Sequence, residues 1–527
     1  MKNIFAKLLI LLFIIIAVVP IITMIIGTIF NDRNFDFAAY QKIFSNLQNW
    51  RLLRNSLTLG LSTALFALAV GIPLGYFLGK TDLPFKSFFK IGFLIPLFFP
   101  PYILSIAWSH ILGKQGLLQT LFGVGSFTSD FLFSLPGAAF VLTNIYYPLV
   151  MLICLAAFYG IDRSFEDEAL LHTGERKILS RILLPLILPF LKAAFLFVFI
   201  IALSEFGVPA FLGTNVYTVE ILTQFSAFYD FQTATAHAVI LVFVALVIVI
   251  SSRKLVNRIS TGIMESLGYA NYRIINLKRW KIPVLILVSL AFFFFVLLPL
   301  AVLVCKSLPL NTYIQAFNLA SSGILHSLLW SGIGATTLVL FGFVFGYFRI
   351  REHWQSINPL TLFTFAIPST VLGIGLISLW NRGAPFYFVY NSILMVLFVY
   401  IARFVFITQN VISGAISQIP VSYEEAAFLE GGGRFKIIGK IIIPLSKPAL
   451  IAAWILGFIF CFGEIGATLL VYPPGSSTLP IKIFTITANS PENLAAALCM
   501  LLVLIILISL GVFFLTLKSF RKNLIML

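Results

Sequence analysis

Charged residues are scarce in this chain of 527 residues. Asp, Glu, Lys and Arg together make up 10% of it, whereas 60% of the residues are hydrophobic. Soluble globular proteins carry about 25% charged residues. The composition therefore excludes a soluble enzyme, a nucleic-acid-binding protein and a disordered chain.

Cysteine and histidine are also rare, with four and five copies. Neither residue type shows the spacing of a metal site, and the cysteines fall in or beside apolar stretches, where they are expected to act as small buried hydrophobes. The predicted loops are too short for a catalytic domain, so we expect no enzyme and no bound cofactor. The four cysteines are Cys154, Cys305, Cys461 and Cys499.

What the chain has instead is long apolar runs. A bilayer core needs about 20 consecutive apolar residues as helix, and continuous runs such as 292–304 exclude the alternation of a β-barrel. The sequence thus predicts an all-α polytopic membrane protein with about 12 transmembrane helices. The predicted spans are 6–30, 56–79, 88–112, 135–160, 187–212, 234–252, 282–306, 327–349, 358–380, 391–416, 447–472 and 494–517.

The basic residues indicate the orientation of these spans. With the N-terminus inside, 25 of the 35 Lys and Arg fall in cytoplasmic segments and 8 in external loops, as the positive-inside rule requires. The net charge of +16 therefore reflects topology and contact with anionic membrane lipid, not nucleic acid. Both termini are expected in the cytoplasm, and the first span is expected to be retained rather than cleaved.

The chain contains an internal repeat. Six spans in each half give both halves the same orientation, so they form two parallel six-helix repeats, with a transport pathway expected between them. We predict a first half at 1–252, a basic linker at 253–281 and a second half at 282–527. The repeated landmarks are Gly75-Tyr76 with Gly346-Tyr347, the proline breaks at Pro100 and Pro368, Pro185 with Pro444, and Glu205 with Glu464.

A cytoplasmic loop in the second half, at about 420–444, carries a short predicted helix. Residues 424–429 are good helix formers with acids in the first turn, and the glycines at 431–433 end or bend the helix. The segment after them alternates apolar and basic residues. Such an exposed helix is suited to docking a soluble partner.

This loop resembles the EAA loop of ATP-binding-cassette importer permeases. The resemblance rests on Glu425-Ala426-Ala427, on Gly431 six residues after the glutamate, and on Pro444 nineteen residues after it. It implies that residues 424–436 form a coupling helix that docks on an ATPase subunit, present in two copies. Gly79-Lys80-Thr81 lacks the earlier glycine of a phosphate-binding loop, so ATP use is expected on that partner.

The first half carries a degenerate copy of the loop at about 162–185. Glu168-Ala169 has Gly174 six residues on, whereas counting back nineteen from Pro185 gives Glu166, with an aspartate where alanine is expected. The spacing leaves these two registers open. An ordinary interfacial helix is the alternative reading.

Two acids lie within predicted spans. Glu205 and Glu464 each follow the loop proline by twenty residues. Intramembrane acids are costly and usually face an interior or a water-filled cavity. These two could cap helix breaks, line the translocation pathway or ligate a cation. Arg403, also within a span, could snorkel, pair with an acid or attract an anion.

The whole chain is similar to the fused ferric iron permeases, most closely in the external segments that follow Glu205 and Glu464. This resemblance implies a bacterial inner-membrane permease that receives ferric iron from an extracytoplasmic binding protein. Related permeases carry thiamine, phosphonates or polyamines, and these cargoes remain alternatives. An ion-coupled secondary transporter is a more distant one, and it would have no use for paired coupling loops.

Overall fold

The computed structural model describes residues 4–31, 34–35, 37–171, 175–266, 272–487 and 489–525. Ten helices in this part of the chain are long and apolar enough to cross a membrane. Two further helix pairs, Lys86–Phe98 with Pro101–Phe122 and Ile357–Ala366 with Ser369–Trp380, are each bent by 100° and give up to 12 spans. The predicted all-α fold with about 12 membrane helices is confirmed, as are the proline breaks at Pro100 and Pro368.

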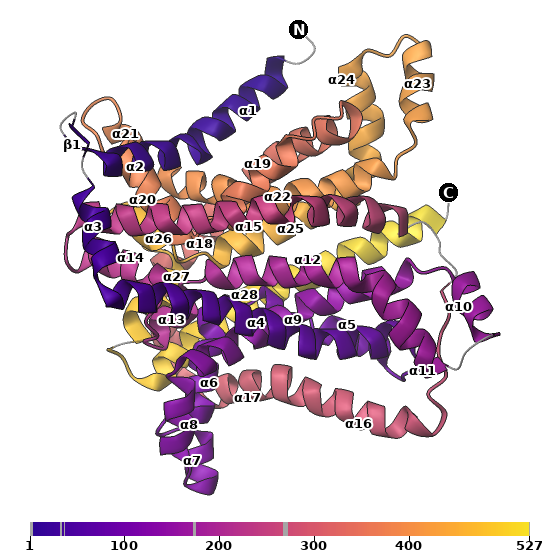
Figure 1. The fold of residues 1–527 in the computed structure, drawn as a ribbon, viewed down its shortest axis with the longest axis horizontal. Coiled ribbons are helices and arrows are strands. Elements are labelled where there is room, and N and C mark those ends of the chain that lie inside the picture. The colour runs from indigo at the N-terminus through magenta and orange to yellow at the C-terminus, as the bar shows by residue number, and fades with distance from the viewer. Residues whose placement is uncertain are drawn as a thin grey trace. The chain divides into compact units, whose positions relative to one another are not determined.

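The two sequence halves share the order of their long spanning helices and loop helices and differ in the short elements between them; the helices are labelled in Figure 1. The first half contains α1 (Ile4–Ala17), α2 (Val19–Ile29), β1 (Phe30–Asn31), β2 (Asn34–Phe35), α3 (Ala38–Ser45), α4 (Leu47–Lys80), α5 (Lys86–Gly92), η1 (Ile95–Phe98), α6 (Pro101–Leu112), α7 (Leu117–Phe122), α8 (Gly125–Leu132), α9 (Leu135–Tyr159), α10 (Arg163–Leu170), α11 (Glu175–Ile178), η2 (Leu179–Leu183), α12 (Leu184–Leu203), α13 (Gly207–Phe211), α14 (Tyr217–Ser226) and α15 (Phe231–Ser266).

The elements of the second half begin at the end of the predicted basic linker of 253–281. It contains η3 (Lys278–Trp280), α16 (Lys281–Phe292), η4 (Phe293–Leu297), α17 (Leu298–Lys306), α18 (Asn311–Arg351), α19 (Ile357–Ala366), α20 (Ser369–Trp380), α21 (Tyr387–Tyr390), α22 (Leu394–Ser417), α23 (Val421–Leu429), α24 (Arg434–Ile437), η5 (Ile438–Ile442), α25 (Ile443–Gly463), α26 (Thr468–Val471), α27 (Leu479–Thr487) and α28 (Glu492–Ile525).

The chain packs into two compact units that do not follow its halves. Unit 1 comprises Met1–Ile43, Gln224–Val242 and Pro309–Leu527, and unit 2 comprises Phe44–Thr223 and Phe243–Leu308. The first helices of each half therefore belong to the unit built mainly from the other half. In unit 1, α1 and α2 pack on helices of the second half, and in unit 2, α16 and α17 pack on helices of the first.

Unit 1 shows how the N-terminal helices are held. The ring of Phe13 in α1 meets the ring of Phe345 in α18 edge-on, with centroids 5.5 Å apart. A Cβ added to Gly375 in α20 would lie 3.3 Å from the carbonyl oxygen of Pro20 in α2. These close contacts bury apolar surface from helices more than 300 residues apart in sequence.

Glycines allow the second and fourth spans of each unit to approach closely. In unit 2, a Cβ at Gly71 of α4 would lie 2.6 Å from Cβ of Val150 in α9. In unit 1, a Cβ at Gly342 of α18 would lie 2.8 Å from Oγ1 of Thr408 in α22. Gly71 and Gly342 are 271 residues apart, the offset that also separates Gly75 from Gly346. Small residues at helix contacts are a common packing device in membranes.

In the part of the chain that the structure describes, three spans contain a π-helical turn next to a proline. The turns η2, η4 and η5 are each followed by an α-helix whose second residue is proline, namely Pro185, Pro299 and Pro444. Proline has no N–H to donate and its ring crowds the preceding turn. The wider π turn accommodates both effects without ending the span.

Candidate coupling loops and intramembrane acids

The predicted loop helix of the second half is α23, which has Glu424 in its first turn. Gly431 ends it with a φ of +77°, a conformation that favours glycine. The N–H of Gly432 donates to the carbonyl of Ala427 at 2.9 Å, which closes the last turn. In Figure 1, α23 and α24 extend beyond the ends of α22 and α25.

The outer surface of this loop carries large apolar side chains among charged ones. Glu425 and Ala426 of the motif are exposed, and Ala427 is half-buried. Around them, Phe428, Leu429 and Phe435 are 67%, 87% and 89% exposed. We call these three side chains the apolar tip. Exposed large apolar side chains on one loop make it a candidate interaction surface.

The opposite side of the same loop is fixed to the end of α18. Arg351, the last residue of α18, forms an ion pair with Glu424 and donates from Nη2 to the carbonyl of Ile419 at 2.8 Å. The hydroxyl of Tyr347 donates to Glu424 at 3.2 Å. Arg434 pairs with Glu352 and lies over the ring of Tyr347. Charged contacts therefore anchor one side of the loop helix, and large apolar side chains are exposed on its other side.

The loop of the first half has the same plan. Helix α10 is capped by Asp162, whose carboxylate accepts from the N–H of Ser164 at 2.8 Å, and this hydrogen bond lowers the pKa of Asp162. Glu166 forms an ion pair with Lys80, the last residue of α4. Glu168 is exposed and Ala169 half-buried, whereas Gly174 lies outside the described residues.

The two ion pairs fix the register between the loops. Lys80 and Arg351 are 271 residues apart, like Gly75 and Gly346. The starts of α10 and α23 are 258 residues apart, and so are Glu166 and Glu424. Asp167 consequently takes the place of Glu425. This register differs from both alternatives that spacing had given.

Sequence reasoning missed Lys80 and Arg351 as parts of the loops. Each is the final residue of a long helix, and its partner lies 86 or 73 residues further along the chain. The shared offset of 271 was visible in the sequence. Nothing local, however, connects a helix end with a loop so far away.

The carboxylate of Glu205 caps a helix break in unit 2. It lies between α12 and α13 and accepts a hydrogen bond from the N–H of Gly207 at 2.9 Å. The hydroxyl of Tyr146 in α9 donates to the same carboxylate at 3.2 Å. Glu205 is buried, so the capping bonds satisfy a backbone donor that has no helical partner.

Glu464 does the same in unit 1, between α25 and α26. Its carboxylate accepts from the N–H groups of Ala467 and Thr468, both at 2.9 Å, and from the hydroxyl of Thr468. Nη1 of Arg403 in α22 lies 3.8 Å from it. Of the roles open to these acids, capping a helix break is the one that the hydrogen bonds show, and Arg403 pairs with an acid.

The segments after both acids are tied back to the second span in the same way. In unit 2, the N–H of Tyr217 donates to Oγ of Ser56 at 2.8 Å. In unit 1, the N–H of Leu479 donates to Oγ of Ser327 at 2.7 Å. The two serines are again 271 residues apart. Each helix break is thus held from both sides.

Within the described ranges, no three His, Cys, Asp or Glu side chains gather as a resident metal site would require. The site residues therefore fall into two groups. Both loops hold an anchored acid, the second also carries the exposed apolar tip, and the intramembrane acids hold the breaks near the far ends of two spans.

Comparison with known proteins gives one family. The model of the family described as "Binding-protein-dependent transport system inner membrane component" matches residues 67–263 and 339–522, more than half of the chain. Each of the two matched ranges contains its own loop and its own intramembrane acid.

Individual relatives extend over most of the chain. The ferric transport system permease protein FbpB of Actinobacillus pleuropneumoniae is 24% identical, over 93% of this chain and 74% of its own length. The Fe(3+)-transport system permease protein FbpB 2 of Haemophilus influenzae is 21% identical, over 86% and 87%. A Salmonella typhimurium protein described as "Putative 2-aminoethylphosphonate transport system permease protein PhnV" is 29% identical, over 42% of this chain and 89% of its own.

Proposed function

Since this chain belongs to the family of binding-protein-dependent transport system inner membrane components, we propose that it is the permease of an ATP-driven importer of ferric iron. The ferric permeases among its relatives support this cargo, because they match nearly the full length of the chain. A phosphonate is the second candidate, supported by the relative that matches one half at 29% identity.

The loops support a separate ATPase as the source of energy. Two ATPase subunits would dock at the two cytoplasmic loops, one at the region of α10 and one at α23. The apolar tip beside Glu425 is the surface offered in the second loop. The residues proposed for coupling are Glu166, Glu168, Ala169, Gly174, Pro185, Glu425, Ala426, Ala427, Gly431 and Pro444.

One observation carries the mechanism, namely that each loop helix is bonded to the last residue of a long spanning helix. A force on α10 reaches α4 through Glu166 and Lys80. A force on α23 reaches α18 through Glu424 and Arg351. ATP-driven closure of the two ATPase subunits would thereby rock the spanning helices and open the pathway alternately to each side.

We place the pathway beside the two helix breaks. Glu205 and Glu464 are buried in their units, and acids inside membrane spans usually border an interior or a water-filled cavity. In this proposal they keep the breaks in shape by capping them. An extracytoplasmic binding protein would deliver the cargo at this end, opposite the loops, in the bacterial inner membrane.

The test is transport by the reconstituted complex. The chain is purified with a candidate ATPase and a candidate binding protein from the same organism, inserted in vesicles, and supplied with ATP and labelled ferric iron, phosphonate, thiamine or polyamine. We expect ATP-dependent accumulation of ferric iron above the other three cargoes. Accumulation without the ATPase would overturn the energy source, and preference for another cargo would overturn the substrate.

A further inference from the structure

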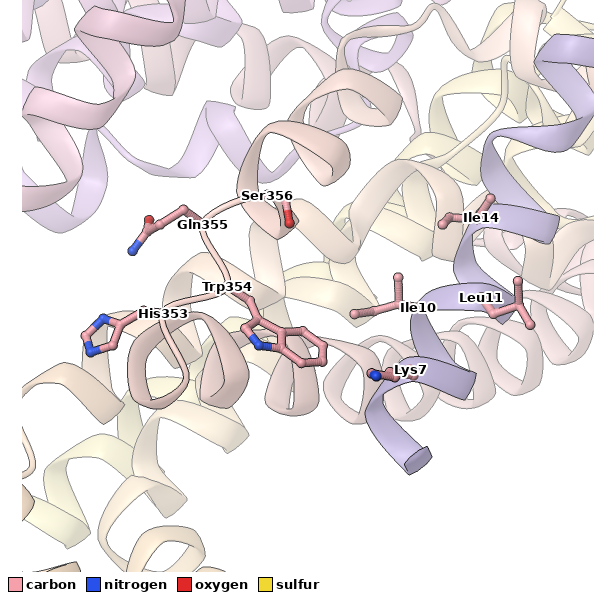
Figure 2. Close-up of a pocket in the computed structure, with 8 residues that line it drawn as sticks. All are labelled: Lys7, Ile10, Leu11, Ile14, His353, Trp354, Gln355 and Ser356. Carbon is pink, nitrogen blue, oxygen red and sulfur yellow. The ribbon is translucent and has the colours of Figure 1, made fainter. Parts of the chain in front are cut away.

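A pocket in unit 1 has no role in the proposed transport cycle. It has a volume of about 630 Å³ and lies between α1 and the loop 352–356 that follows α18 (Figure 2). Helix α1 contributes Lys7 and the aliphatic side chains of Ile10, Leu11 and Ile14. The loop contributes the indole of Trp354 and the polar residues around it.

The lining separates into a polar mouth and an apolar wall. Figure 2 shows the side chains of Lys7 and Trp354 turned toward the same space, with Ile10 and Ile14 further along α1. The pocket-lining face of α1 is itself partly open, since the side chain of Leu11 is 53% exposed. In a membrane this face meets acyl chains, so the pocket opens toward lipid.

The pocket lies at the same end of unit 1 as the loop helix α23. Glu352, at the start of the pocket loop, forms an ion pair with Arg434. The rings of Trp354 and Phe348 are 5.0 Å apart, and the guanidinium of Arg434 lies over Phe348. The distribution of basic residues predicts that this end is cytoplasmic, where the leaflet carries anionic lipid.

The repeat allows this pocket to be compared with the corresponding place in unit 2. By the offset of 271, loop 352–356 corresponds to 81–85. There a segment of the chain is bonded to this loop, because Thr81 pairs with Ile275 and the N–H of Leu277 donates to Asp82 at 2.9 Å. The carboxylate of Asp82 lies 3.1 Å from Nζ of Lys281, in the first turn of α16.

The first span of unit 2 thus has a lysine paired with a carboxylate, beside an apolar side chain, since Leu277 packs on the core. In unit 1, Lys7 of the first span has no acidic partner among the residues that the structure describes. A ligand with a negative charge and an apolar chain would supply both the counter-charge for Lys7 and an apolar contact like that of Leu277 in unit 2. That combination is the chemistry of a phospholipid.

We propose that this pocket binds one anionic phospholipid. The lipid phosphate meets the ammonium of Lys7 and the indole of Trp354, a residue type that favours the membrane interface. One acyl chain lies along Ile10 and Ile14. The bound lipid packs against the loop that carries Glu352, and through Arg434 it steadies the segment that follows α23.

The experiment uses the purified full-length chain in detergent, without ATPase or cargo. Retention of dioleoyl phosphatidylglycerol and dioleoyl phosphatidylcholine is measured by native mass spectrometry. We expect one phosphatidylglycerol to be retained about fivefold more strongly than phosphatidylcholine, the preference that one basic residue provides at a membrane surface. Lys7→Gln should abolish the preference, whereas the control Lys86→Gln, in unit 2, should keep it.

A second variant tests the apolar wall with the charge intact. Ile14→Trp fills the pocket and should expel the lipid, with an unchanged melting temperature in lipid-free detergent. Equal retention of the two lipids by the unaltered chain, or full retention by Lys7→Gln and Ile14→Trp, would overturn the proposal. Displacement of the lipid by inorganic phosphate would assign the site to a free anion instead. Each outcome is independent of whether the chain transports iron.

Discussion

Lys80 and Glu166 form an ion pair from which solvent is excluded, with side chains 0% and 1% exposed. Its counterpart in the other unit, Arg351 with Glu424, is 9% and 15% exposed. Both pairs join the end of a long helix to a loop helix. Breaking the buried pair of Lys80 and Glu166 should destabilise the fold. Breaking the more exposed pair of Arg351 and Glu424 should alter coupling without unfolding the protein.

Removing one partner of the buried pair should destabilise unit 2. Lys80→Met leaves the Glu166 carboxylate buried without a counter-charge, which costs about 3–5 kcal/mol. The measurement is thermal unfolding of the purified chain. The double variant Lys80→Met with Glu166→Gln removes both charges and should recover most of the loss. Equal stability of the single and double variants would show that the ion pair does not hold the loop.

Reversing the charges of the less deeply buried pair should uncouple the transporter. We expect Arg351→Glu to repel Glu424 and lower ATP-dependent uptake about tenfold, a typical size for coupling between two sites. Adding Glu424→Arg restores opposite charges and should recover part of the uptake. Arg382→Glu, in the loop after α20, is the matched control and should transport normally. Failure of the double reversal to recover any uptake would count against the tether.

The apolar tip should matter for partner binding and not for folding. Leu429→Ser and Phe435→Ser alter side chains that are 87% and 89% exposed. The free energy of unfolding should therefore change by less than about 0.5 kcal/mol, and the melting temperature should stay nearly the same. Co-purification with the ATPase should fall. Leu310→Ser, at a 73% exposed position before α18, is the control. Undiminished co-purification of both tip variants would place the ATPase elsewhere.

The ion pair between Lys42 and Asp230 should give unit 1 an acid-sensitive contact. Burial alone would raise the pKa of Asp230, but hydrogen bonds from Thr233 and from Lys42 lower it to about 2. The lysine Nζ lies 2.9 Å from the carboxylate. A depressed pKa stabilises the fold above the unfolded value of 3.8 and loses this contribution as the pH falls toward 2.

Because the Lys42 side chain is 66% exposed, solvent screening reduces the contribution to about 1 kcal/mol or less. We expect Asp230→Asn to remove it across pH 5–8 and to flatten the fall in stability below pH 4. Thermal unfolding of both proteins against pH measures the difference, with Asp130→Asn as control. Parallel pH curves for the variant and the unaltered chain would contradict the assignment.

Sequence patterns predicted the features that depend on local chemistry. Long apolar runs gave the spans, prolines gave the two bent ones, and the glycines after α23 gave its end. The roles of Glu205 and Glu464 stayed open, because capping depends on where backbone N–H groups point after a break. The tether from Lys80 to Glu166 was not predicted, since nothing in hydropathy or spacing shows which helix end meets which loop.

Which helices make up each unit could likewise not be predicted from the sequence. The repeat suggests that each half packs on itself, and all first spans look alike by apolar content. Contacts such as Phe13 with Phe345 depend on which neighbour a helix meets, and apolar burial is non-directional. Only the folded arrangement shows that α1 and α2 belong with the second half.

That arrangement sets an order of events during synthesis. Unit 2 is complete once Leu308 has been made, whereas α2 packs on α20, whose first residue follows the end of α2 by 340 positions. At about 5–20 residues per second, the N-terminal helices wait roughly 17–70 s for their partners. If translation stalled near the middle of the message, unit 2 would be complete, whereas α1 and α2 would lack the helices on which they pack.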